Sequence, residues 1–181
     1  MTITSMQIPN LKTERLTLRP ITLDDQHDIF EYASNPKFSQ RVQWQTHETL
    51  QDTENYIQHT LTQQQQNKDF VWGITLVDTD RVIGTIHLTN YTTIHKRAQL
   101  SFLLSEDYWA RGIMPEAGRA IVEYAFEVLD IQKIIAECFI ENHRTHRVLQ
   151  KIGMGLEGIA KKHICLNGSF HDVILYALFR E

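Results

Sequence analysis

Cysteines, targeting segments and long apolar runs are scarce or absent in this sequence of 181 residues. The two cysteines, Cys138 and Cys165, are too few for a disulfide framework and too far apart for a CxxC motif. Buried small apolar side chains are the simplest interpretation of both, and a reducing compartment fits. The N-terminus has no basic stretch followed by an apolar run, and no segment approaches the roughly 20 apolar residues that span a bilayer. We therefore expect a soluble, cytoplasmic protein without membrane contact.

Basic charge and flexible linkers are scarce too. Lysine and arginine number 18 against 22 aspartates and glutamates, which gives a formal net charge of −4. A general nucleic-acid binder is basic overall, so we expect no nucleic-acid partner, although a local basic patch stays open. No segment rich in glycine, proline or serine divides the chain. A chain of this length fits one domain, residues 1–181.

Hydrophobic periodicity predicts a chain in which strands and helices are interspersed. Strands are predicted at 14–20, 70–77, 81–90, 98–105, 131–140, 156–166 and 171–179. Helices are predicted at 22–33, 46–66, 115–129 and 142–152. The last two strands flank Asn167-Gly168, a strong hairpin signal. This order favours a mixed sheet with helices on both faces.

The segment Tyr108–Ala117 joins a predicted strand to the helix with the clearest periodicity. Pro115 suits the first turn of a helix, and Gly112 lets a ligand approach the backbone closely. Free N–H groups and the helix dipole favour an anion there, and Arg111 adds a bidentate phosphate donor. The loop therefore predicts a pyrophosphate site for a nucleotide-type cofactor, with an ordinary tight connection as the alternative. Neither GxxxxGK(S/T) nor GxGxxG is present, which disfavours a conventional nucleotide-binding domain.

A longer series of motifs runs along almost the whole chain. Residues 108–119 are followed by Glu141-Asn142-x-x-Thr145 and then by Lys151-Ile152-Gly153-Met154. Together with segments 13–19 and 166–173, this series resembles the GNAT acetyltransferase superfamily, and most closely its branch of ribosomal-protein N-terminal acetyltransferases. The resemblance implies an α/β (α+β) fold with a mixed, mostly antiparallel sheet of six to seven strands. It also implies a V-shaped splay between the strands that contain Leu103–Ser105 and Cys138–Ile140.

The resemblance further implies acetyl-CoA as the acyl donor, with its pyrophosphate on the 108–117 loop. The family's fixed glycine is Gly112 here, whereas the last small residue of the loop is replaced by Met114. Asn142 matches a residue that hydrogen-bonds the cofactor arm, and it equally suits the N-cap of the next helix. The residues expected to contact acetyl-CoA are Leu103, Leu104, Arg111, Gly112, Ile113, Met114, Pro115, Glu116, Asn142 and Arg147.

The catalytic groups of the family are only partly present. Much of the family has a tyrosine acid where this chain has Leu149, and Thr145 stands where the branch often has serine, a proposed substitute. As an alternative, Thr145 is simply the third residue of its helix. The candidates for the base are His87, Glu137 and His171. Their alternatives are a satisfied sheet histidine for His87 and a solvated strand face for Glu137, in which case a water chain takes the proton.

Two classes of function follow from these residues. The favoured one is an N-acetyltransferase that moves an acetyl group from acetyl-CoA to a primary amine by direct attack in a ternary complex. The amine belongs to a protein N-terminus, a peptide or a small molecule. The alternative is a non-catalytic acyl-CoA-binding or regulatory module, supported by the departures at Leu149, Met114 and Ile164, the last being a glutamate in the ribosomal branch. A homodimer through the C-terminal hairpin is compatible with the sequence but not required by it.

A few other side chains suggest binding roles. His143 and His146 lie three residues apart on a predicted helix, but without a third ligand we expect no metal. With Arg144 and Arg147 they are expected to form a basic helix face near the cofactor's phosphates. Further pocket candidates, for which packing is the alternative, are Trp44, Tyr91 and Phe170.

Overall fold

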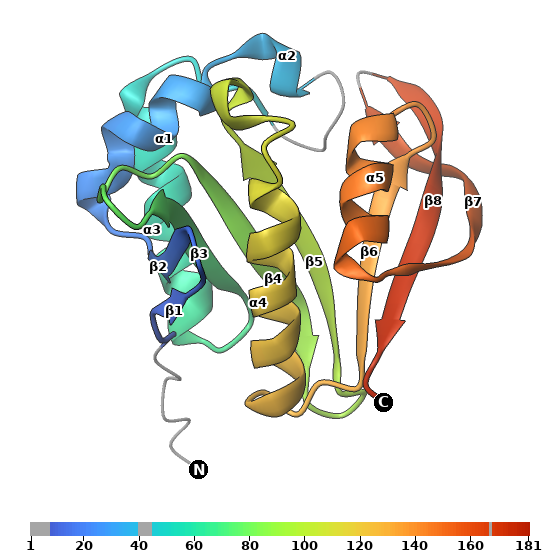
Figure 1. The fold of residues 1–181 in the computed structure, drawn as a ribbon. Coiled ribbons are helices and arrows are strands. Elements are labelled where there is room, and N and C mark those ends of the chain that lie inside the picture. The colour runs from blue at the N-terminus through green and yellow to red at the C-terminus, as the bar shows by residue number, and fades with distance from the viewer. Residues whose placement is uncertain (1–7, 40–44, 167) are drawn as a thin grey trace.

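The computed structural model describes residues 8–39, 45–166 and 168–181, which form a mixed sheet with helices on both faces (Figure 1). The strands are β1 (Leu11–Lys12), β2 (Leu16–Pro20), β3 (Phe70–Leu76), β4 (Gly84–Thr92), β5 (Arg97–Leu104), β6 (Lys133–Phe139), β7 (Gly155–Leu166) and β8 (Ser169–Phe179). The helices are α1 (Gln26–Ala33), α2 (Pro36–Ser39), α3 (Leu50–Gln65), α4 (Ile113–Glu127) and α5 (His143–Ile152). No helix in these ranges combines the length and apolar character needed to cross a membrane.

The sheet has the strand order β1-β2-β3-β4-β5-β6-β8-β7. All neighbouring strands are antiparallel except β5 and β6, which are parallel because α4 carries the chain back between them. These two strands pair only where Arg97–Gln99 lies beside Lys133–Ile135, and they separate beyond that point. The predicted mixed, mostly antiparallel sheet and its V-shaped splay are therefore confirmed.

Three details differ from the predicted elements. The sheet has eight strands rather than six or seven, because β1 has only two residues and is too short to show an alternation. The helix α2 was also not predicted, because its four residues are too few to show a helical periodicity. Helix α3 begins at Leu50 instead of Thr46, because Thr49 and Asp52 form a capping box in which the Asp52 carboxylate accepts the Thr49 N–H at 2.8 Å.

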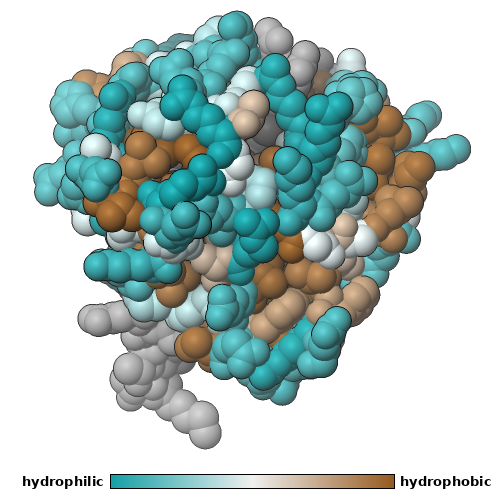
Figure 2. All heavy atoms as spheres, viewed as in Figure 1, coloured by the Kyte–Doolittle hydropathy of each residue, from teal (hydrophilic) through white to brown (hydrophobic). Residues whose placement is uncertain are grey.

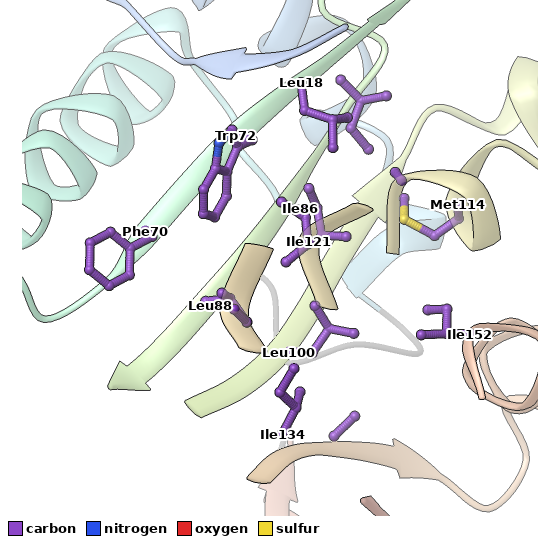
Figure 3. Close-up of a cluster of buried hydrophobic side chains, with 14 of the residues drawn as sticks. Leu18, Phe70, Trp72, Ile86, Leu88, Leu100, Met114, Ile121, Ile134 and Ile152 are labelled. Atoms are coloured by element: carbon purple, nitrogen blue, oxygen red, sulfur yellow. The ribbon is translucent and has the colours of Figure 1, made fainter. Parts of the chain in front are cut away.

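Two hydrophobic clusters lie on opposite faces of the sheet. Trp72 and Ile86 belong to the larger cluster, where Ile121 of α4 packs against the sheet (Figure 3). Val71, which points to the other face of β3, joins Ile57 of α3 in the smaller cluster. Successive side chains of a strand point to opposite faces, so this alternation puts α4 and α5 over one face and α1 and α3 over the other.

The edge of the sheet at β7 is apolar on its surface. Leu156 and Ile159 of β7 and Phe179 of β8 are each more than half exposed. Figure 2 shows hydrophobic side chains gathering toward this edge and hydrophilic ones over α4 and α5. The homodimer expected at this hairpin stays a prediction. In the hairpin turn, Asn167 lies outside the described residues, while Gly168 has a φ of 77°.

Candidate active site

The loop after β5 enters α4 through two residues with positive φ. Ala110 has a φ of 60° and Gly112 a φ of 76°. Gly112 is the N-cap of α4, where a left-handed backbone suits glycine better than a residue with a side chain. Trp109 Nε1 donates a hydrogen bond to the Leu104 carbonyl at 2.7 Å, which fixes the loop to the end of β5. The first-turn N–H groups of α4 have no partners within the helix, so they are available at the predicted phosphate loop.

A cavity of about 410 Å³ lies between this loop and α5, and we call it the basic cavity. Its wall includes the segment 112–115, and its cationic side chains are Lys37, Arg144, Arg147 and Lys151. No aspartate or glutamate within the described ranges lines it. The three α5 cations share one helix face because they are spaced three and four residues apart. The Arg144 guanidinium lies 4.5 Å from the centroid of the Trp109 ring, which holds this cation beside the loop.

Two residues expected at the phosphates make other contacts. The Glu116 carboxylate accepts hydrogen bonds from Thr13 Oγ1 at 2.6 Å and from Arg15 Nε at 2.7 Å. Burial by itself raises the pKa of Glu116, but the hydrogen bonds from Thr13 and Arg15 outweigh it and lower that pKa. The Arg111 carbonyl accepts a hydrogen bond from Arg15 Nη1 at 3.1 Å, and the Arg111 guanidinium lies over the Tyr108 ring. Neither Arg111 nor Glu116 lines the basic cavity; both tie the start of α4 to the turn before β2.

The Met114 side chain belongs to the core. It is 3% exposed and packs in the larger hydrophobic cluster (Figure 3). Where the family has a small residue, this chain therefore has a methionine whose side chain is packed in the interior. The loop contributes mainly backbone groups to the wall of the basic cavity.

The backbone groups of β5 alternate between its two neighbours. Ser105 N–H donates to the Ile83 carbonyl at 2.8 Å, so Leu103, two residues earlier, also pairs with β4. The N–H and carbonyl groups of Phe102 and the N–H group of Leu104 consequently face β6, in the region where the two strands have separated, whereas the Leu104 carbonyl accepts the hydrogen bond from Trp109 Nε1. Of the two leucines predicted to hold the cofactor, Leu104 thus turns its backbone N–H toward the opening and Leu103 lines it.

A second cavity, of about 380 Å³, lies on the face of the sheet that α3 covers, and we call it the acidic cavity. Val71, His87 and Ser101 line it from three neighbouring strands, side by side in register. Its carboxylates are Asp69 and Glu137. No lysine or arginine in the part of the chain that the structure describes lines it. The two cavities therefore differ in charge as well as in position.

The basic and acidic cavities meet where β5 and β6 separate. Four residues line both of them, namely Phe102, Leu103, Asn142 and Thr145. The lining of the acidic cavity includes Tyr56 of α3 on one face of the sheet and Leu149 of α5 on the other, so the separation of the strands is a slot through the sheet. A ligand with its anionic end in the basic cavity can extend through this slot to the acidic cavity.

His87 lines the acidic cavity within a polar cluster. Its Nε2 lies 2.9 Å from Thr85 Oγ1 and 3.3 Å from the Tyr56 hydroxyl. Burial lowers the pKa of His87 to about 4 and raises the pKa of Tyr56 to about 12, so both side chains are neutral near pH 7. A neutral imidazole with so low a pKa accepts a hydrogen bond but is a weak base. His87 therefore has hydrogen-bond partners within the sheet, as a structural histidine would, and it also lines the acidic cavity.

Asn142 and Thr145 lie at the slot and also begin α5. Asn142 is 8% exposed, and its Oδ1 accepts the Thr145 N–H at 3.3 Å as the helix N-cap. Since Asn142 lines both cavities too, its capping role leaves room for a ligand contact. Glu137 lies on β6 across the slot from Ser101, two residues beyond the last β5–β6 pair. Its Oε1 is 3.6 Å from Nε2 of His163.

Several other residues of the acidic cavity supply no acid or base. Leu149 and Ile164, which replace the family's tyrosine and glutamate, both line it. Cys138 lines it as well, and burial raises the pKa of its thiol to about 12, so the thiol is protonated.

His171, the third base candidate, packs edge-on against Phe139 at 5.4 Å between ring centroids and lines neither cavity.

The two histidines of α5 have different surroundings. His146 is buried, with Nδ1 3.1 Å from the Tyr176 hydroxyl and Nε2 3.1 Å from the Ile140 carbonyl, whereas His143 is exposed. No group of three or more potential metal ligands is present within the described ranges. The predicted basic face of α5 consists of Arg144, Arg147 and Lys151.

Two of the three aromatic pocket candidates, Tyr91 and Phe170, line neither cavity. Tyr91 packs against Phe70 with ring centroids 5.5 Å apart, and Phe170 is 66% exposed. Trp44 lies outside the described residues. Sequence reasoning missed several residues that line a cavity, and Lys37, Tyr56, Asp69 and Lys151 are among them. Only Lys151 had a local signal, its spacing from Arg144 and Arg147.

Comparison with known proteins gives a consistent result. Residues 15–155 match the family model described as an acetyltransferase (GNAT) domain. The chain is 30% identical over 172 residues to YoaA of Bacillus subtilis (strain 168), an uncharacterized N-acetyltransferase, with 95% of this chain and 97% of that one covered. It is 24% identical over 98 residues to spermidine N(1)-acetyltransferase of Escherichia coli (strain K12), which covers 54% of this chain and 53% of that one.

A solved structure agrees in fold. RimL, a ribosomal alpha-N-protein acetyltransferase in complex with coenzyme A, superposes with a TM-score of 0.87 at 21% identity, covering 94% of this chain and 98% of that one. The family match spans well over half of the chain, and the splayed strands, the loop and α4 agree with it. The chain therefore belongs to the GNAT acetyltransferase family, and it is an acetyl-CoA-dependent N-acetyltransferase.

Proposed function

We propose that the protein transfers the acetyl group of acetyl-CoA to a primary amine by direct attack within a ternary complex. The observation that carries this proposal is the slot, at which a basic cavity and an acidic cavity of opposite faces share four residues. Donor and acceptor then approach the thioester from opposite sides of the sheet. Relatives named for acting on spermidine or on a protein α-amine both use amine acceptors, which fits this class.

The basic cavity is the proposed site for the phosphates of acetyl-CoA. The first-turn N–H groups of Ile113 and Met114 point toward an anion, and Gly112 allows the phosphates to approach the backbone. Arg144, Arg147 and Lys151 add charge along one side. The pantetheine arm then runs along the slot, where the backbone N–H of Leu104 faces β6 and Asn142 lies opposite.

The reaction requires one bond to form and one to break. The neutral amine attacks the thioester carbonyl carbon, the new N–C bond forms, the C–S bond breaks, and coenzyme A leaves as the thiolate or thiol. In our proposal the Thr145 hydroxyl keeps its proton and donates a hydrogen bond to the sulfur or the carbonyl oxygen at the slot. His87 accepts a hydrogen bond from the attacking amine and orients it, because its low pKa disfavours holding the proton. Glu137, across the slot, receives the proton that the amine loses.

Two measurements test the proposal. Isothermal titration with acetyl-CoA tests the donor site, and absence of binding at millimolar concentration would contradict it. Release of free thiol from acetyl-CoA over a panel of amines, peptide N-termini and polyamines tests transfer. Turnover above the uncatalysed rate with at least one amine is the expected result. Binding without turnover on any acceptor would instead support the non-catalytic alternative.

A further inference from the structure

Asp69 lines the acidic cavity at a level of the sheet where β5 and β6 still pair, away from the slot. Phe70 pairs with Leu88, so Asp69 is level with Thr89 of β4, which in turn pairs with Gln99 of β5. Gln99 is also the last β5 residue that still pairs with β6, so the sheet is continuous at this level. The cavity therefore extends from the slot to a level of the sheet where its lining includes a carboxylate.

The Asp69 carboxylate is fixed in place. Its Oδ1 accepts the Asn90 N–H at 3.1 Å. Within the described ranges, Asp69 makes no ion pair with a lysine or arginine. The other titratable groups that line the cavity are Tyr56, His59, His87, Glu137 and Cys138. An anionic group held in a cavity of this size favours a cation from the ligand.

That cation is not the nitrogen that reacts. The attacking amine needs a free lone pair, and a neighbouring carboxylate stabilises the ammonium form instead. Asp69 therefore assists the reaction only if it binds a positive charge elsewhere on the acceptor, so that remote binding energy positions the reacting end. We propose, building on the proposed function, that the acceptor is a small aliphatic diamine whose second ammonium binds Asp69 while its neutral amine reaches the slot.

The strand register gives the spacing of the two nitrogen atoms. Thr89 lies two residues from His87, and Gln99 lies four residues from Leu103 at the slot. At roughly 3.3 Å per residue, these separations are about 7 and 13 Å. The two ends of the diamine are thus separated by about 7–13 Å. A cavity of about 380 Å³ is within the range of small-ligand sites, which favours a small molecule over a folded protein surface.

The experiment measures kcat/KM for propane-, butane-, hexane- and octanediamine and for monoamines of matched length, by thiol release from acetyl-CoA. The longer diamines are expected to exceed the matched monoamines by roughly 10-fold or more, the usual value of a charged hydrogen bond. Asp69→Asn should remove this preference by lowering kcat/KM for the longer diamines to the value of the matched monoamines. The amide oxygen at that position still accepts the Asn90 N–H, so folding is preserved, as thermal unfolding would verify.

Asp78→Asn is the matched control, because it removes an exposed carboxylate in the β3–β4 connection that lines neither cavity. It should leave the diamine preference intact. The inference is overturned if wild-type protein uses monoamines or neutral peptides as well as diamines, or if Asp69→Asn retains the preference. Acetyl-CoA titration separates failure of the diamine inference from failure of the proposed function. If the wild-type protein binds acetyl-CoA and acetylates monoamines but shows no diamine preference, the acetyltransferase assignment stays intact.

Discussion

The basic and acidic cavities are built in different ways. The basic cavity combines the backbone at the start of one helix with cations on one face of a second helix. The acidic cavity collects residues from five strands, β3 to β7, and from α3 and α5, which lie far apart along the chain. A polyanion needs charge and exposed N–H groups, which a short segment can provide. A selective amine site needs particular groups at particular separations, and only the assembled sheet provides them.

The largest expected effect is on the basic cavity. Gly112→Glu puts a carboxylate at a left-handed position beside the phosphates, and like-charge contact of this kind costs enough to weaken acetyl-CoA binding roughly 10³-fold. Isothermal titration gives the dissociation constant. Arg111→Ala should change it little, because Arg111 does not line the cavity. Gly158→Glu, at a position with open space around it, is the matched control for the added charge. Equal, negligible effects of all three variants would mean that the loop is only a connector.

The next effect is on the acidic cavity and on turnover. His87→Gln should lower kcat roughly 10²-fold, the lower end of proton-transfer effects, because His87 orients the amine and is a weak base. The affinity for acetyl-CoA should stay unchanged. Since the pKa of His87 is about 4, the variant and the wild type should have pH–rate profiles of the same shape above about pH 6. An unchanged kcat, or an inflection near neutral pH that the substitution removes, would contradict this role.

The same histidine predicts a pH dependence of stability. Its pKa falls from 6.5 in the unfolded chain to about 4 in the folded protein. As the pH falls below 6.5, the unfolded chain therefore binds a proton that the folded protein does not, and stability is lost until the pH reaches about 4. The loss is about 2 kcal/mol near pH 4.5, at 1.36 kcal/mol per pKa unit.

Urea unfolding of the wild type and of His87→Gln, at several values between about pH 7 and pH 4.5, measures this loss. The variant should show a shallower decline. Burial also lowers the pKa of His47, so a residual decline should remain, and His47→Gln serves as the comparison. Parallel curves for the wild type and His87→Gln would show that His87 is not desolvated.

The smallest effect concerns a single cation of the basic cavity. Arg144→Ala removes the guanidinium over Trp109 and should weaken acetyl-CoA binding about 10-fold, the value of one charged hydrogen bond. The loss should shrink at high salt, because salt screens the attraction between partly exposed charges. Lys161→Ala on β7, which lines neither cavity, is the control. If both variants bind acetyl-CoA like the wild type, the phosphates do not lie against α5.

Local sequence was sufficient for much of the donor side. Gly112 and Pro115 indicated the start of α4 because backbone constraints act within a few residues. The arginines of α5 followed from helical spacing, and Asn142 from its capping preference. The same reasoning predicted Arg111 and Glu116 at the phosphates. It could not anticipate that Arg15, about a hundred residues earlier, donates hydrogen bonds to the Glu116 carboxylate and to the Arg111 carbonyl.

The sequence by itself determined the family, the order of the elements apart from β1 and α2, and the glycine at the start of α4, because each depends on residues close together in the chain. Only the tertiary structure decided that a basic and an acidic cavity meet at the predicted splay, that His87 is neutral, and that Asp69 and Glu137 line one cavity. These properties depend on strand register and burial, which join segments far apart in the sequence. The physical reason is that charge, desolvation and separation within a cavity depend on neighbours that no local pattern specifies.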